Sequence, residues 1–140
     1  MKPFNERWSV VREKPEMLQP VMLRLINALD ELDGLLDGGL LIHCLYDADR
    51  ESGNYHKRGM ACDCHIQGWH PLDQFLFVER QQLFAGIGIY GCDIWNNPGL
   101  HVDMRDGRAA RWAFKAGDSG GRVQVALDKR YITYLLNIMP

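Results

Sequence analysis

The sequence predicts an α+β fold in which one antiparallel β-sheet carries helices packed on one face. Apolar residues recur at helical spacing in two stretches, and stretches of strand length stand between and after them. Their order is helix, strand, strand, helix and then several short strands. A chain of 140 residues can bury one core without metal or disulfides, so we expect residues 1–140 to form a single domain.

The first predicted helix begins near Leu18 and ends near Gly34. Apolar residues follow one another at helical spacing over this stretch, and most charged residues fall on the opposite side. Pro20 suits a first helical turn, where its missing amide proton is not needed, and a glycine such as Gly34 favours a helix end. Residues 1–15 show no clear period, and we expect an extended arm or a short strand there.

Two strands are predicted after this helix. A glycine-containing turn at residues 37–39 leads into residues 40–46, which are apolar enough for a buried strand. Residues 47–55 are polar and predict a loop, and residues 59–66 predict the second strand. Side chains alternate between the two faces of a strand, which separates a site-facing pair from a core-facing pair. The pairs are Ala61 with Asp63, and Cys62 with Cys64.

The C-terminal half predicts a second helix and further strands. Helical spacing returns over residues 71–84, and two antiparallel strands are expected over residues 87–90 and 100–104, joined by a loop. Another strand is expected over residues 110–115. Residues 131–138 favour a short helix on the sheet, although their β-branched and aromatic content leaves a strand open.

Composition and charge exclude several classes of function. The net charge is -2, with 46% hydrophobic and 24% charged residues, which predicts a soluble globular protein without a bias toward nucleic acid or anionic membranes. The apolar runs are too short for a membrane span. Residues 1–8 lack the apolar core of a signal peptide, so we expect synthesis in the cytoplasm.

The four cysteines are expected to be reduced, because no secretory signal accompanies them. Buried, unreactive side chains are the favoured interpretation. A structural zinc site built on Cys62, Cys64 and His65 stays open as an alternative, although the spacing is short and no second ligand pair follows.

Two histidines and one aspartate have the pattern of an open metal site. His56 and Asp63 lie seven residues apart, and His101 follows 38 residues after Asp63. Two imidazoles and a carboxylate give zinc three protein ligands and leave the fourth position to water. Gly59 and Ala61 are small residues between the first two ligands, which favours a tight turn close to the metal.

These residues match a known signature. The segment 56–63 reads His-x-x-Gly-x-Ala-x-Asp, and it is followed by Gly-Ile-Gly-Ile-Tyr at 86–90 and by Leu-His-Val-Asp-Met-Arg at 100–105. This pattern resembles the zinc D-alanyl-D-alanine peptidases, a superfamily that includes the hedgehog signalling domain, and in particular a branch often found in phage and prophage gene clusters. The likeness covers roughly residues 20–112.

The resemblance implies a hedgehog/DD-peptidase-like fold and a bound Zn²⁺ held by His56, Asp63 and His101. It also implies a metallopeptidase that hydrolyses an amide bond in peptidoglycan peptides, as a D-alanyl-D-alanine carboxypeptidase or as a murein endopeptidase. We expect this protein to be a monomer. Without a signal peptide, such an enzyme would reach the cell wall through release during phage lysis or as part of a virion.

Two catalytic parts depart from the family pattern. Pro98 stands where several branches carry a glutamate base, and Asp47 stands where many relatives carry an arginine. Asp103 matches the aspartate of the family's His-x-Asp motif, and we predict it as the base or as the group that orients a ligand. Asp93 is the reserve candidate for the base. Arg105 is predicted to stabilise the oxyanion, with Arg50 and Arg58 as further candidates.

Aromatic residues are candidates for substrate contacts. Trp95 lies in a polar loop and is the favoured one, and Tyr90 is the second, although a core position competes for it. Trp112 is expected in the core. Because of the missing glutamate and arginine, a catalytically inactive zinc-binding module of the same fold, which binds cell wall or protein, is the alternative function.

Overall fold

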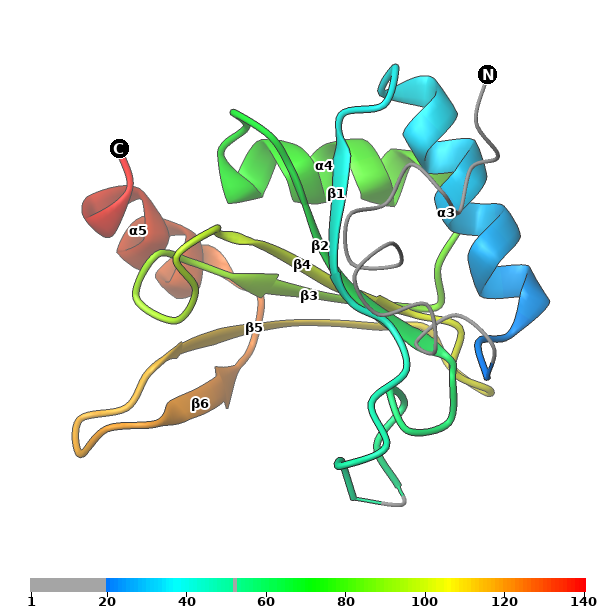
Figure 1. Ribbon diagram of the computed structural model, residues 1–140. Helices are drawn as coiled ribbons and strands as arrows, with labels where there is room; N and C mark the ends of the chain where they lie inside the picture. Colours follow the sequence, from blue (N-terminus) through cyan, green and yellow to red (C-terminus); the bar gives the residue numbers. More distant parts are fainter. Residues whose placement is uncertain (1–19, 52) are drawn as a thin grey trace.

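The computed structural model describes residues 20–51 and 53–140, and these ranges form a sheet with helices against it (Figure 1). The described helices are α3 (Leu23–Leu35), α4 (Pro71–Gln81) and α5 (Lys129–Ile138). The described strands are β1 (Leu40–Cys44), β2 (Ala61–Ile66), β3 (Gly86–Tyr90), β4 (Gly99–Asp103), β5 (Ala110–Ala116) and β6 (Arg122–Val125). The α+β class is confirmed. The arm predicted for residues 1–15 lies outside the described residues.

The strands form one six-stranded sheet in the order β1-β2-β4-β3-β5-β6. All neighbours are antiparallel except β3 and β5, which run parallel. The prediction of a wholly antiparallel sheet is therefore wrong at this pair. The physical reason is that β4 inserts between β2 and β3, so the chain must cross to the free edge of β3 before β5 begins. The edge strand β6 was not predicted.

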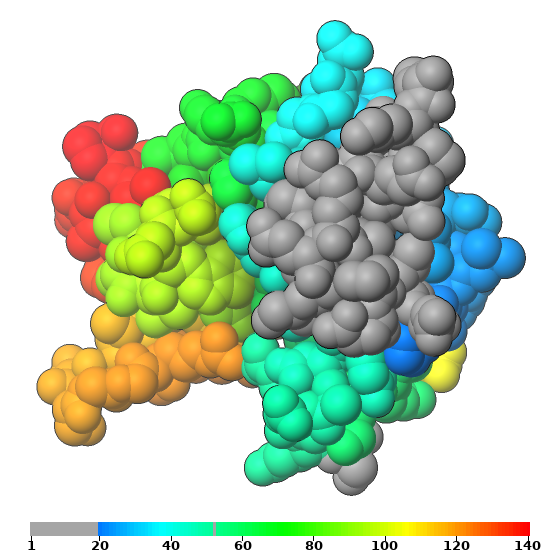
Figure 2. Space-filling model, viewed as in Figure 1, coloured from blue at the N-terminus to red at the C-terminus, as the bar shows by residue number. Residues whose placement is uncertain are grey.

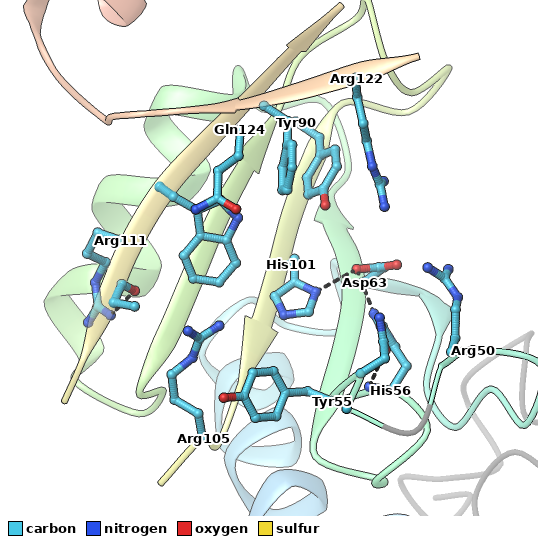
Figure 3. A pocket seen from close by; sticks show the side chains of 15 residues that line it. Arg50, Tyr55, His56, Asp63, Tyr90, His101, Arg105, Arg111, Arg122 and Gln124 are labelled. Carbon is cyan, nitrogen blue, oxygen red and sulfur yellow. Dashed lines mark hydrogen bonds and ion pairs between the residues drawn. The ribbon is translucent and has the colours of Figure 1, made fainter. Parts of the chain in front are cut away.

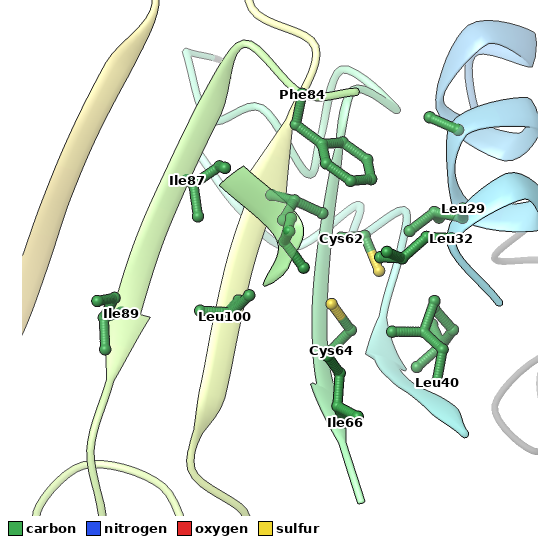
Figure 4. Close-up of a cluster of buried hydrophobic side chains, with 14 of the residues drawn as sticks. Leu29, Leu32, Leu40, Cys62, Cys64, Ile66, Phe84, Ile87, Ile89 and Leu100 are labelled. Carbon is green, nitrogen blue, oxygen red and sulfur yellow. The ribbon is translucent and has the colours of Figure 1, made fainter. Parts of the chain in front are cut away.

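The three described helices cover the same face of the sheet. Leucines of α3, Val78 of α4 and Leu135 of α5 belong to one hydrophobic cluster with every second residue of the central strands. Figure 4 shows Leu29 and Leu32 of α3 beside the strand residues of this cluster. Among these strand residues are Cys62, Cys64, Ile87, Ile89, Leu100 and Val102. Each large apolar side chain buried there stabilises the fold by about 1.5–3 kcal/mol. The predicted arrangement of helices on one face is confirmed, and the opposite face is left for a site.

The ends of α3 differ from those predicted. Pro20 precedes the helix, and Gly34 lies inside its last turn. The chain leaves the helix at Asp37 and Gly38, whose φ angles are 53° and 82°. The left-handed residue directly after the cap is Asp37, and the amides of Asp37 and Gly38 bind the carbonyls of Gly34 and Asp33, so the helix ends past Gly34.

The other two helices have side-chain caps. His70 Nδ1 accepts a hydrogen bond from the amide of Leu72 at 3.1 Å, and its Nε2 donates to the carbonyl of Met139 at 2.7 Å, which ties α4 to the C-terminus. Asp128 caps α5 by accepting from the amide of Tyr131 at 3.0 Å. The helix option for the C-terminal tail is confirmed. None of the helices in the described ranges has the length and apolar character that crossing a bilayer requires.

The cysteines of β2 point into the core. Cys62 and Cys64 are buried in the hydrophobic cluster, as the alternation predicts, and neither forms a disulfide. His65 lies between Cys64 and Ile66 on the strand and faces the opposite side. The alternative zinc site on Cys62, Cys64 and His65 is therefore wrong, because its donor atoms lie on two faces of the sheet.

Candidate metal centre

The face of the sheet that the helices leave uncovered carries a cavity. The segment between β1 and β2 and the β5–β6 hairpin both project on this side of the sheet (Figures 1 and 2). The cavity between them has a volume of about 360 Å³, and both projections contribute to its lining. From the first come Arg50, Asn54, Tyr55 and His56, from the hairpin come Arg122 and Gln124, and from the central strands come Asp63, Tyr90, His101 and Trp112.

The three predicted metal ligands meet in this cavity. Oδ1 of Asp63 lies 3.2 Å from Nε2 of His56 and 3.2 Å from Nδ1 of His101 (Figure 3). The two imidazole rings are 5.1 Å apart between centroids and stand at 77° to each other. β2 and β4 pair with Asp63 opposite His101, so the sheet itself sets their separation. Residues that are 38 positions apart in the chain are thereby brought to one point.

The outer nitrogen of each imidazole has its own partner. His56 Nδ1 lies 2.9 Å from the carbonyl oxygen of Leu45, which can only accept, so this nitrogen is the donor. His101 Nε2 lies 2.9 Å from Oδ2 of Asp103 and donates to that carboxylate. In the neutral rings the inner nitrogens are then both acceptors. Two lone pairs and a carboxylate oxygen face one another, an arrangement that only protons or a metal cation can stabilise.

The pKa shifts of Asp63 and His56 also favour positive charge at this point. Burial raises the pKa of Asp63, but hydrogen bonds from His101 and His56 outweigh burial and hold this pKa well below its usual range. Burial lowers the pKa of His56, but the hydrogen bonds and charges of Asp63 and Cys44 outweigh it and raise the pKa to about 10. Both shifts favour positive charge between these groups, which a bound cation would also supply.

Cys44 adds a donor that the sequence did not reveal. Its Sγ and the ligand atoms of His56 and Asp63 all lie within 4.8 Å of one another. Regular alternation from Leu40 and Ile42 would send Cys44 into the core. A β-bulge between Ile42 and Cys44 instead places Cys44 opposite Asp63 on β2. Bulges re-aim side chains in this way beside functional sites, and the sequence carries no evident signal for this one.

Asp103 is held away from the cavity. Its side chain is 0% exposed, and it accepts two hydrogen bonds from the guanidinium of Arg105, at 2.8 and 2.7 Å, as well as the one from His101. Burial raises the pKa of Asp103, but the hydrogen bonds from Arg105 and His101 outweigh burial and lower it. A carboxylate so occupied favours the predicted orienting role over that of a base.

Arg105 is fixed on several sides. Beside its pair with Asp103, its guanidinium lies 4.7 Å from the ring centroids of both Tyr55 and Trp112. Such contacts stabilise a planar cation and restrict its motion. Arg105 lines the cavity next to His101, so the predicted position beside the metal ligands is compatible with the structure.

Glycines make room for this cluster. A Cβ at Gly86 would lie 2.3 Å from Oδ1 of Asp103, and one at Gly88 would lie 2.5 Å from Nε1 of Trp112. The Gly-Ile-Gly pattern of β3 therefore leaves space for side chains on the site face. Gly59 has φ 68° and approaches the carbonyl of Pro20, where a Cβ would come within 2.0 Å. This chain packing, and not closeness to the metal, accounts for the glycine.

The predicted aromatic contacts lie around Asp63. Tyr90 is 4% exposed and stacks on Trp95, with 3.9 Å between ring centroids and 2° between planes. Trp95 lines a second cavity of about 340 Å³ that also reaches Asp63 and His43. Trp112 is buried as predicted, but it lies on the site face against His101 and not in the helix-covered core.

Asp93, the reserve candidate for the base, lies elsewhere. Its Oδ2 accepts hydrogen bonds from the amide of Ala116 at 2.8 Å and from the hydroxyl of Tyr134. The Asp93 bond raises the pKa of Tyr134 to about 12. Asp93 thus links the β3–β4 loop to β5 and α5. Asp93 does not line either cavity beside Asp63, so the structure gives its reserve role as base no support.

Comparison of the chain with models of known protein families, with curated proteins and with solved structures finds no significant match. A function for this protein is therefore inferred from the donor atoms of the site and from the motifs of its sequence.

Proposed function

We propose that this protein is a zinc metallopeptidase that hydrolyses an amide bond in peptidoglycan peptides. The observation that carries the proposal is the convergence of three acceptor atoms, from His56, Asp63 and His101, inside a cavity large enough for a peptide end. Each outer imidazole nitrogen is bound to a carbonyl or carboxylate, which is the usual support for metal-ligating histidines.

The donor set fits zinc better than magnesium or calcium. Imidazole nitrogens, one carboxylate oxygen and an adjacent thiol suit a borderline-soft ion, whereas magnesium and calcium prefer oxygen ligands alone. A zinc ion with an open coordination position would lower the pKa of a bound water to about 7 and polarise the carbonyl of an amide.

The residues of the chain supply position and charge for this chemistry. Asp103 fixes the tautomer and the orientation of His101 through Nε2, and Leu45 does the same for His56. Arg105, immobilised against Asp103, contributes positive charge to the wall beside His101, where an amide oxygen that gains negative charge would be stabilised. The ionised Asp63 reduces the net charge of the centre to about +1 with two neutral imidazoles.

The peptidoglycan substrate follows from the motif resemblance, supported by the position of the matching residues. The three ligands and Arg105 line one cavity, and Asp103 binds His101 and Arg105 from behind it. The glycines of the Gly-Ile-Gly-Ile-Tyr motif leave room for Asp103 and Trp112. The predicted monomeric state and the release from a phage-infected cell or virion belong to the same proposal.

The proposal is tested with zinc-loaded protein and purified peptidoglycan. We expect release of amines or muropeptides that stops when a chelator removes the metal and returns when zinc is added back. Metal content is measured on the same samples by elemental analysis. Protein that holds one zinc per chain and releases nothing would contradict the peptidase proposal.

A zinc-binding module without catalysis is the second candidate, and two observations favour it. Cys44 Sγ lies within 4.8 Å of the ligand atoms of His56 and Asp63, in a group that does not include His101, and a site closed by a protein thiolate is commonly structural. In the described part of the chain, Asp63 is also the sole carboxylate among the residues lining the larger cavity, so a separate base is missing there.

Replacing Cys44 with serine separates the two candidates. If the thiolate is a ligand, Cys44→Ser should lower zinc affinity by about 10-fold or more, because a soft donor is lost. If the fourth position is open, zinc affinity should change little and hydrolysis should persist. Competition with a chromogenic chelator measures the affinity, and Cys92→Ser, at an exposed cysteine, is the matched control.

A further inference from the structure

Four arginines line the larger cavity, and three of them are paired with acids. Arg50 binds Asp47 at 2.8 Å, Arg105 binds Asp103, and Arg111 binds Glu79. Arg122 has no carboxylate partner within residues 20–51 and 53–140. The positive charge of Arg122 is therefore uncompensated beside a cavity.

Aromatic rings hold this free arginine over the cavity. The guanidinium carbon of Arg122 lies 5.4 Å from the ring centroid of Tyr90 and 5.1 Å from that of Phe114. Because β6 pairs with β5, Arg122 stands on the same side of the sheet as Phe114 and Gln124. An arginine stacked on aromatic faces loses little further freedom when it binds a planar anion.

A second cation approaches the same place from the opposite projection. In Figure 3 the side chains of Arg50 and Arg122 reach toward Asp63 from two directions, and the ring of Tyr90 lies beside Arg122. The phenol hydroxyl of Tyr90 is a hydrogen-bond donor at neutral pH.

We propose that Arg122, Arg50 and Tyr90 form a carboxylate subsite beside the metal centre, so that the substrate presents a free C-terminal carboxylate next to the reacting amide. Guanidinium groups bind carboxylates with charge-assisted hydrogen bonds, and a phenol donor completes such a site. This inference rests on the proposed function, because it assumes that the metal centre hydrolyses an amide. The subsite favours the carboxypeptidase form of that function over the endopeptidase form. A carboxypeptidase substrate has a free C-terminal carboxylate on the residue that is removed. In an endopeptidase substrate the peptide continues on both sides of the bond that is cleaved.

The test compares two uncleavable peptides on zinc-loaded protein by calorimetry. Both end in a D-alanyl-D-alanine unit whose amide is replaced by a ketomethylene group, and one carries a C-terminal carboxylate while the other carries a carboxamide. We expect the carboxylate form to bind about 10-fold or more tightly. Arg122→Gln should abolish most of this preference, and Arg122→Lys should retain part of it. Arg80→Gln, at an exposed position of α4, is the matched control and should retain all of it.

Equal affinity for both forms, or a preference that survives Arg122→Gln, would overturn the subsite. Hydrolysis of the parent amide peptides separates this inference from the proposed function. Protein that prefers the carboxylate analogue but cleaves neither amide would retain the subsite and refute the activity. Protein that cleaves the acid and the carboxamide equally would retain the activity and refute the subsite.

Discussion

Asp63→Ala is expected to abolish stoichiometric metal binding and any amide hydrolysis. Oδ1 of Asp63 is the atom on which both imidazoles converge, so its removal leaves two acceptors without the negative charge that draws a cation between them. The loss in zinc affinity should exceed the roughly 10–100-fold that follows loss of an outer partner of a metal ligand. Elemental analysis after dialysis against limiting zinc measures it.

The control for this variant is Asp118→Ala, which removes a carboxylate from the exposed β5–β6 turn. Its zinc content and its activity should equal those of the unaltered protein. Full zinc occupancy in Asp63→Ala would contradict the metal centre itself, and with it the peptidase and the module alike. Loss of the metal with retained folding, seen by circular dichroism, is the expected outcome.

Asp103→Asn is expected to weaken zinc binding by about 10–100-fold and to destabilise the fold by about 3 kcal/mol. The carboxylate is fully buried and satisfies both Arg105 and His101. An amide of the same size cannot carry the charge that holds the guanidinium, and it leaves the His101 tautomer undefined. Denaturant unfolding measures the stability, and chelator competition measures the affinity.

The pattern of losses tells whether Asp103 orients or reacts. An orienting residue should lower zinc affinity in Asp103→Asn, and added zinc should restore part of the hydrolysis rate. If Asp103 were the base, the rate would stay low at saturating zinc while the affinity stayed unchanged, and our assignment would be wrong. Arg105→Lys supplies a comparison, because it retains the charge beside Asp103 but not the two-point contact.

The local sequence pattern was sufficient to predict the helices and strands that bury one face. The helices predicted over residues 18–34 and 71–84 exist, with observed bounds 23–35 and 71–81, and the alternation of Cys62 with Asp63 was predicted correctly, because each pattern reflects contact with one core. β6 was not predicted because its four residues, Arg-Val-Gln-Val, lie at the edge of the sheet and are mostly exposed, so no face of the strand is clearly buried. The parallel pairing of β3 with β5 depends on chain crossing, which no local period records.

The site residues that belong to the sequence motifs could be predicted, and those outside the motifs could not. His56, Asp63 and His101 were found by residue type and spacing, and the structure brings them together. Cys44 was missed because a bulge reverses the face that alternation assigns to it. Arg122 was missed because its place beside Tyr90 arises only when the β5–β6 hairpin folds over the sheet.

The pairing of β4 between β2 and β3 also bears on how this chain can vary in length. Leu100 and Val102 enter the core, and His101 and Asp103, the residues that alternate with them, enter the site. Deletion of a single residue within β4 would exchange the two sets, since each successive side chain lies on the opposite face. Insertions and deletions in natural variants should therefore fall in the connecting loops, and β4 should keep its length of five residues.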